Sequence, residues 1–253
     1  MWNLKSVTHK MRLKNSMILG ALMLFMQCAE KTATDYTIEA SFASKAPVID
    51  GKADEPIWQQ AKPIALKENR SGKEVLEPGL QTHVKACYDD STLYFLFVCN
   101  DPDIWAAFTQ RDEYLWEEEV VEVFIDVDDV PETYVEIEVS PSNVLFDSYI
   151  VDPENIDVPA TARFNLPRLK TGVTVQGTLN QREDLDSSWT VEMAIPFEDL
   201  ATATTENVGP ETEIKLNFYR LDKNQGEEPT SYAWSPTGKS FHKPSVFGKL
   251  VFK

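Results

Sequence analysis

Two segments of the sequence concentrate carboxylates in patterns that can do chemistry. The segment WEEEVVEVFID, from Trp116 to Asp126, alternates so that Glu122 shares one strand face with Phe124. The segment TYVEIEVS places Glu136 and Glu138 together on one face of a second strand. A glycoside hydrolase uses a pair of such carboxylates as its general acid and its nucleophile or base. The pattern therefore allows glycosidic hydrolysis, although 41 acidic residues in the chain make chance pairs common.

Other catalytic machinery is poorly represented. The chain has three histidines, His9, His83 and His242, and His9 lies in a basic leader. The sequence contains no GxSxG, HExxH, P-loop, paired CxxC or CxxCH motif. Nucleophilic triads, zinc sites and haem sites are therefore not indicated. If the chain is an enzyme, the carboxylates are its candidate catalytic groups.

The same residues suit a binding site for sugar. Pyranose rings present apolar C–H faces that stack on aromatic rings, and their hydroxyls need fixed donors and acceptors nearby. Trp116 stands among glutamates, where burial is less natural than for Trp58 or Trp189, whose neighbours have core spacing. We therefore predict that Trp116 and Glu122 contribute to such a site.

A second ring for this site comes from the Pro- and Gly-rich segment Ser235 to Lys249. In one interpretation Phe241 forms a wall of a sugar cleft, with His242 beside it, while Phe247 returns the chain to the core. In the other, these rings plug the end of the fold. Charged and polar neighbours of Phe241 favour the cleft.

Short β-prone runs separated by turn residues must position these side chains. From Ala65 onward the hydrophobic period is close to two, which predicts an all-β fold, an antiparallel β-sandwich with jelly-roll or immunoglobulin-like layering. TLYFLFVC is apolar on both faces and is predicted to be a central strand. One or two short helical turns are expected, at DEPIWQQA (Asp54 to Ala61, with Asp54 as N-cap) and PFEDL. The strand runs are QTHVKACY, TLYFLFVC, EVVEVFIDV, TYVEIEVS, VLFDSYIV, GVTVQGTLN, WTVEMAIP, EIKLNFYRL and KLVFK.

The turn YDDST predicts a hairpin that places Cys87 opposite Tyr94 and leaves Cys99 about five residues further from the turn. We therefore predict two buried thiols and no disulfide, with Cys99 on the strand face of Leu93 and Phe95.

The N-terminal segment has the composition of an export signal. A basic leader precedes the apolar run MILGALMLFM, and Cys28 follows almost at once, which resembles the lipobox of bacterial lipoproteins. We predict a signal peptide over 1–27, a lipid anchor on Cys28, a linker over 28–40 and one domain over 41–253. An uncleaved anchor or a misassigned start codon is the alternative. The net charge of −17 disfavours nucleic acid as a partner.

Motifs in a fixed order connect the chain to a known family. PVIDGKADEPIWQQA, CNDPDIW, LWEEEVVEVFID, YVEIEVSPSNVLFD, WTVEMAIPFEDL, IKLNFYRLD and YAWSPTGKSFHKPSVFGKLVF occur between Val48 and Phe252. In this order they resemble family 9 carbohydrate-binding modules of the xylanase-associated type. The resemblance implies a β-sandwich that holds a xylan or glucan chain between two aromatic rings.

By this resemblance, the first ring is Trp116 and the acceptor beside it is Glu122. The second ring is Phe241, where the xylanase-linked modules have Trp. The strand LNFYR implies a polar contact from Tyr219 or from Asn217 on the same face. The family also implies structural calcium, for which Asp101 and Asp103 are the candidates in this chain.

We therefore expect an exported, lipid-anchored cell-envelope protein, periplasmic or associated with the outer membrane, that binds an oligo- or polysaccharide without cleaving it and requires no cofactor. One alternative is a glycoside hydrolase that uses Glu122 with Glu136 or Glu138. Another is a structural or assembly lipoprotein that binds no sugar.

Overall fold

The structure is a computed structural model that describes residues 36–224 and 228–253. Its regular elements are mostly strands, which confirms the predicted all-β class. The strands are β1 (Thr37–Phe42), β2 (Ile64–Ala65), β3 (Lys67–Glu68), β4 (Thr82–Tyr88), β5 (Thr92–Asn100), β6 (Val120–Asp126), β7 (Tyr134–Val139), β8 (Leu145–Ile150), β9 (Lys170–Gln176), β10 (Ser188–Pro196), β11 (Ile214–Asp222), β12 (Thr230–Ala233) and β13 (Gly248–Phe252). The helices are α1 (Pro56–Gln60), α2 (Val158–Thr161) and α3 (Phe197–Leu200), with 3-10 turns η2 (Pro78–Leu80), η3 (Leu115–Glu117), η4 (Ala201–Ala203) and η5 (Pro244–Val246).

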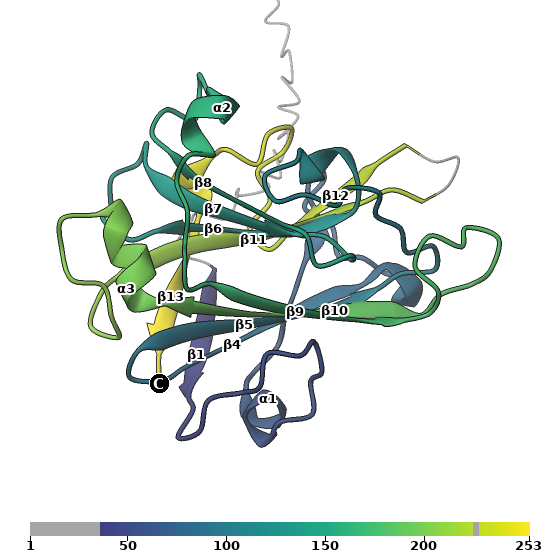
Figure 1. The fold of residues 1–253 in the computed structure, drawn as a ribbon, viewed down its shortest axis with the longest axis horizontal. Helices are drawn as coiled ribbons and strands as arrows, with labels where there is room; N and C mark the ends of the chain where they lie inside the picture. The colour runs from purple at the N-terminus through teal and green to yellow at the C-terminus, as the bar shows by residue number, and fades with distance from the viewer. Residues whose placement is uncertain (1–35, 225–227) are drawn as a thin grey trace, which may run out of the picture. The chain divides into compact units, whose positions relative to one another are not determined.

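The main strands follow one hydrogen-bonded path that folds into two layers. Along this path the order is β8-β7-β6-β11-β13-β1-β4-β5-β10-β9. Figure 1 shows β6, β7, β8 and β11 in one layer and β4, β5, β9 and β10 in the other. The ring of Phe218 on β11 lies 5.0 Å from that of Phe95 and 5.6 Å from that of Phe97, both on β5. Because the two layers share this apolar core, the predicted β-sandwich is confirmed.

β1 departs from the predicted antiparallel pairing. It pairs in parallel with both β13 and β4, with Thr37 opposite Lys249 and Ala40 opposite Ala86. The other strand pairs of the described chain are antiparallel. Hairpin signals in a sequence reveal pairing between neighbouring strands only, whereas parallel partners are joined by long connections. The direction of β1 therefore could not be predicted from alternation.

β5 is covered on both faces, as its apolar sequence predicted. Its odd-numbered residues enter the core between the layers, whereas Tyr94 and Leu96 pack with Trp58 of α1 on the opposite face. Trp58 is fully buried, and its Nε1 donates a hydrogen bond of 2.7 Å to Oε1 of Glu192 on β10. The helical turn at DEPIWQQA is confirmed, but its N-cap is Glu55 rather than the predicted Asp54.

The β4–β5 hairpin has the predicted register, with Cys87 opposite Tyr94 and Cys99 opposite Thr82. Both cysteines are buried free thiols. Cys99 lies in the core between the layers and Cys87 in the cluster around α1, so the two thiols occupy opposite faces of the sheet.

The first strand begins at Thr37, four residues before the predicted start of the domain at 41. Ile38 and Ala40 point inward and are fully buried, so the segment alternates as a strand does. The predicted signal peptide 1–27, Cys28 and residues 29–35 of the predicted linker lie outside the described residues. Within residues 36–224 and 228–253, no helix has the length and apolar character needed to cross a bilayer.

Candidate functional site

A pocket with a volume of about 510 Å³ opens on the outer face of the layer formed by β6, β7, β8 and β11. Residues 121, 123 and 125 of β6 face the core between the layers, so Glu122 between them faces outward into this pocket. Trp116, Phe241 and His242 also line it. The structure therefore brings together four of the residues predicted from the sequence.

Trp116 forms one side of the pocket from the 3-10 turn η3, just before β6. Its half-buried ring stacks on Tyr114, with centroids 4.7 Å apart and planes at 20°, and meets Phe146 edge to face at 5.3 Å. Packing on two sides fixes the orientation of the indole while part of it stays open to the pocket.

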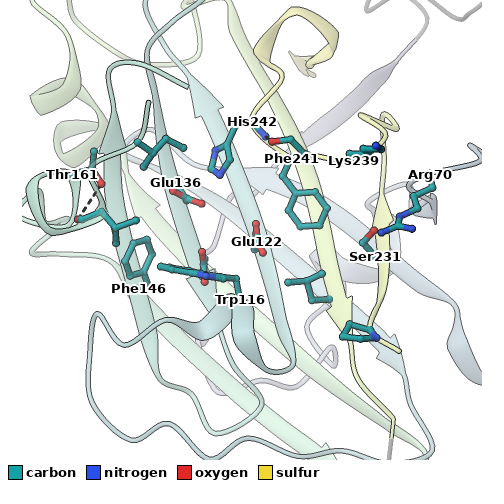
Figure 2. Close-up of a pocket in the computed structure, with 16 residues that line it drawn as sticks. Arg70, Trp116, Glu122, Glu136, Phe146, Thr161, Ser231, Lys239, Phe241 and His242 are labelled. Carbon is teal, nitrogen blue, oxygen red and sulfur yellow. Dashed lines mark hydrogen bonds between the residues drawn. The ribbon is translucent and has the colours of Figure 1, made fainter. Parts of the chain in front are cut away.

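Phe241 lies across Glu122 from Trp116, as Figure 2 shows. One face of its ring stacks on Tyr219, with centroids 4.2 Å apart and planes at 13°. The Tyr219 hydroxyl also donates a hydrogen bond of 2.8 Å to the backbone carbonyl of Phe241. One ring face is thus occupied by Tyr219, and the half-buried Phe241 lines the pocket with the remainder.

Asn217 and Tyr219 lie on the predicted face of β11, but neither reaches the pocket surface. Both are fully buried beneath the loop that carries Phe241. The Nδ2 of Asn217 donates to the Tyr219 hydroxyl at 2.8 Å and to the carbonyl of Ser235 at 2.7 Å. Its Oδ1 accepts from the backbone N–H of Ser235 at 2.9 Å. These two residues position the loop, and in this structure they offer no direct contact to a ligand.

His242 contributes a neutral polar group to the pocket. Burial lowers the pKa of its imidazole to about 4, so the ring is uncharged at neutral pH. Its Nδ1 lies 2.6 Å from the hydroxyl of Tyr134, and its ring stacks on Phe124 with centroids 5.3 Å apart. Phe247, five residues later, is buried beside Phe124 and Tyr134, so it returns the chain to the interior as predicted.

Three glutamates meet on the wall of the pocket. Pairing of β6 with β7 places Glu122 opposite Glu138, and Glu136 lies on the same face two residues earlier. One carboxylate oxygen of each lies within 4.8 Å of those of the other two, and all three side chains are buried. Burial and the neighbouring carboxylates raise the pKa of Glu122 and of Glu138 well above the ordinary value, and burial raises that of Glu136 to about 7.

Other residues that line the pocket were not predicted from the sequence. Arg70 comes from the long loop after β3, and Lys239 from the loop that carries Phe241. Val158 and Thr161 come from the unpredicted helix α2, where Asp157 accepts a hydrogen bond from the backbone of Ala160. An acidic N-cap followed by proline in the first turn could have revealed α2, whereas nothing in the sequence pattern places Arg70 at the pocket.

The predicted calcium ligands lie elsewhere and are already neutralised. Asp101 is buried and accepts hydrogen bonds from Arg220 at 2.7 Å and from Trp189 Nε1 at 3.1 Å. Asp103 pairs with Arg182 through two hydrogen bonds of 2.6 and 3.2 Å. Because each carboxylate already has an arginine as its counter-charge, Asp101 and Asp103 do not fit a calcium site.

Comparison with known proteins gives relatives along most of the chain. An extracellular protein of Arthroderma benhamiae is 29% identical over 185 residues, which are 70% of this chain and 80% of that protein. Endo-1,4-beta-xylanase A of Thermotoga neapolitana is 28% identical over 206 residues, which are 81% of this chain but only 17% of the xylanase.

A similar fold occurs in a family 9 carbohydrate-binding module of Caldicellulosiruptor kristjanssonii, solved in complex with cellotriose. The TM-score is 0.60 at 18% identity, and the match covers 86% of this chain and 94% of the module. Residues 49–253 match the family described as "Carbohydrate family 9 binding domain-like". Since this match spans most of the sequence, the chain belongs to that family.

Proposed function

We propose that the protein binds an oligo- or polysaccharide in the pocket between Trp116 and Phe241 and does not cleave it. The observation that carries this proposal is the placement of two aromatic rings, distant in sequence, in one pocket with Glu122 between them. Aromatic faces stack on the C–H faces of a sugar ring, and a buried carboxylate accepts hydrogen bonds from its hydroxyl groups.

The relatives support a β-1,4-linked glucan or xylan as the ligand. One solved module of the family holds cellotriose, and the Thermotoga relative is named as a xylanase. Phe241 offers a smaller stacking surface than a tryptophan would, so the hold on one sugar ring is expected to be weaker at that side.

We also propose that the mature protein is exported and anchored to the cell envelope by a lipid on Cys28. The basic leader, the short apolar run and the cysteine that follows support this proposal. Mass spectrometry of the protein from its native membrane tests it, because lipidation adds the mass of acyl chains to a mature N-terminus at Cys28. An unmodified or uncleaved N-terminus would contradict the anchor.

Calorimetric titration with cello- and xylo-oligosaccharides tests sugar binding directly. Trp116→Ala and Phe241→Ala should each weaken binding about tenfold or more, which corresponds to about 1.4 kcal/mol. Phe42→Ala is a matched control, because Phe42 is an exposed ring outside the pocket. Binding that survives unchanged in both pocket variants would reject the site.

The three converging glutamates keep a glycoside hydrolase as a second candidate function. Their raised pKa values would allow one carboxyl group to stay protonated as an acid beside an ionised partner. Release of reducing sugar from a panel of glycans, abolished by Glu122→Gln, would support this activity. A panel without any release, under conditions where the sugars bind, would exclude it for those glycans.

A further inference from the structure

The acidic wall of the pocket has features that a carbohydrate acceptor alone does not need. One carboxylate oxygen from each of Glu122, Glu136 and Glu138 lies within 4.8 Å of the other two. Oxygens that bind one Ca²⁺ lie about 2.3–2.6 Å from it and so at most about 5.2 Å from one another. The oxygens therefore lie within the limit for three ligands of one Ca²⁺ ion.

Two carboxylate oxygens of this cluster have no hydrogen-bond partner within the described residues. Oε1 of Glu122 and Oε2 of Glu138 are buried and accept no hydrogen bond within the described residues. Both side chains are only 1% exposed, and both line the pocket. Glu136 differs, because its Oε2 accepts a hydrogen bond of 2.8 Å from Ser148. A buried carboxylate oxygen without a partner is costly, so the arrangement calls for a cation or a donor from outside.

A second acidic cluster in the same chain shows how a cationic side chain neutralises converging buried carboxylates. Asp101, Glu119 and Asp222 also converge, and Arg220 lies 2.7 Å from Asp101 and 3.4 Å from Asp222. Among the ion pairs of the described chain, none involves the three glutamates of the pocket. Arg220 neutralises the cluster of Asp101, Glu119 and Asp222, whereas the cluster of Glu122, Glu136 and Glu138 has no such cation in the described part of the chain and can take an ion from solvent.

We propose that Glu122, Glu136 and Glu138 bind a Ca²⁺ ion on the wall of the pocket. Three carboxylates supply three to six oxygens, and Ca²⁺ takes six to eight. The remaining positions face the pocket, where water or two neighbouring sugar hydroxyls complete the sphere. That last step rests on the proposed function, and it makes sugar binding depend on Ca²⁺.

Calorimetric titration of Ca²⁺ into protein freed of metal by EDTA tests the site. One ion per chain is expected for the wild type, with a higher melting temperature when Ca²⁺ is present. Glu122→Gln and Glu138→Gln should each abolish the uptake, because they remove a charge and keep the side-chain shape. Glu154→Gln is the matched control, since Glu154 is exposed and outside the pocket.

Terbium luminescence gives the position of the ion independently of stability. Tb³⁺ in the pocket should be sensitised by excitation of Trp116, with emission that is lost in Trp116→Phe and in Glu138→Gln but kept in Glu154→Gln. Absence of metal uptake by the folded wild type, or unchanged uptake in both glutamine variants of the wall, would overturn the site.

Sugar titrations with EDTA and with Ca²⁺ separate this proposal from the proposed function. Sugar binding that needs Ca²⁺ supports both the ion site and the proposed function. Ca²⁺ uptake without any sugar binding supports the ion site and rejects the proposed function. Sugar binding that is unchanged by EDTA, in a protein that takes up Ca²⁺, overturns the contribution of the ion to sugar recognition. Preferential binding of an amine-bearing sugar that Ca²⁺ does not displace would overturn the ion site in favour of an ammonium group.

Discussion

Replacing Tyr219 with Phe should destabilise the protein and weaken its hold on a ligand that Tyr219 never touches. The change removes one hydroxyl and leaves the aromatic ring that stacks on Phe241 at 4.2 Å. That hydroxyl donates to the Phe241 carbonyl at 2.8 Å and accepts from Nδ2 of Asn217 at 2.8 Å. Both hydrogen bonds disappear together in the variant.

The expected loss of stability depends on where the two groups that lose a hydrogen bond lie, namely the Asn217 side-chain amide and the Phe241 carbonyl. Asn217 is fully buried and keeps one of its two Nδ2 hydrogen bonds, to Ser235, so one amide hydrogen loses its partner. Phe241 lines the pocket, so we expect water to replace the donor that its carbonyl loses. An unsatisfied buried donor costs about 1–3 kcal/mol, and we expect a loss of that size in the free energy of unfolding. A loop that must be reordered on binding should lower sugar affinity by about 5- to 30-fold.

Urea denaturation followed by circular dichroism measures the first effect, and calorimetric titration with an oligosaccharide measures the second. Tyr149→Phe is the matched control, since no hydrogen bond of its hydroxyl is found within the described residues and it lies outside the pocket. It should change the free energy of unfolding by less than about 0.5 kcal/mol. Equal stability of Tyr219→Phe and the wild type would show that the hydroxyl does not hold the loop.

Three further predictions concern the stability of the fold. Gly51→Ala should lower the free energy of unfolding by about 3 kcal/mol or more, because Gly51 has φ of +81° and an added Cβ would lie 2.5 Å from the backbone of β9. Gly209→Ala is the control: its added Cβ would meet nothing within 4 Å, so the variant should be nearly neutral in thermal unfolding. Trp58→Phe should cost about 1–3 kcal/mol in urea denaturation, since it leaves the buried Oε1 of Glu192 without its donor; stability equal to the wild type would contradict this. Burial raises the pKa of Glu119 to about 10, so the folded state holds this proton more tightly than the unfolded state does. The stability of the wild type relative to Glu119→Gln should therefore fall, by up to about 1.4 kcal/mol per pH unit, as pH rises from 5 to 8, and a constant difference between them would refute the shift.

The parts of the site that could be predicted depend on local patterns. Alternation along β6 is sufficient to place Glu122 on the outer face, and alternation along β7 places Glu136 and Glu138 on the same face. Trp116 and Phe241 could be predicted as site residues because their sequence neighbours are polar, which disfavours burial. The order of the motifs supported the same two residues. These features survive in the structure because they depend on neighbours in sequence.

The parts that could not be predicted depend on what covers a strand. Alternation placed Asn217 and Tyr219 on the correct face, but it cannot show that the loop of residues 235–247 lies over them. The pairing of Arg220 with Asp101 was equally hidden, because an arginine on the inner face of a strand gives no sign of its partner. Arg70 reaches the pocket from a loop without periodicity.

The parallel pairing of β1 with β13 has a consequence for how the chain reaches its native state. β13 fills the place between β11 and β1, so contacts that close the sheet join residues more than 200 positions apart. Such high contact order predicts slow folding, since β11 and β1 cannot be joined into one sheet until β13 has paired with both. A nascent chain that stops before residue 248 would present two unpaired strand edges, which favour aggregation over folding.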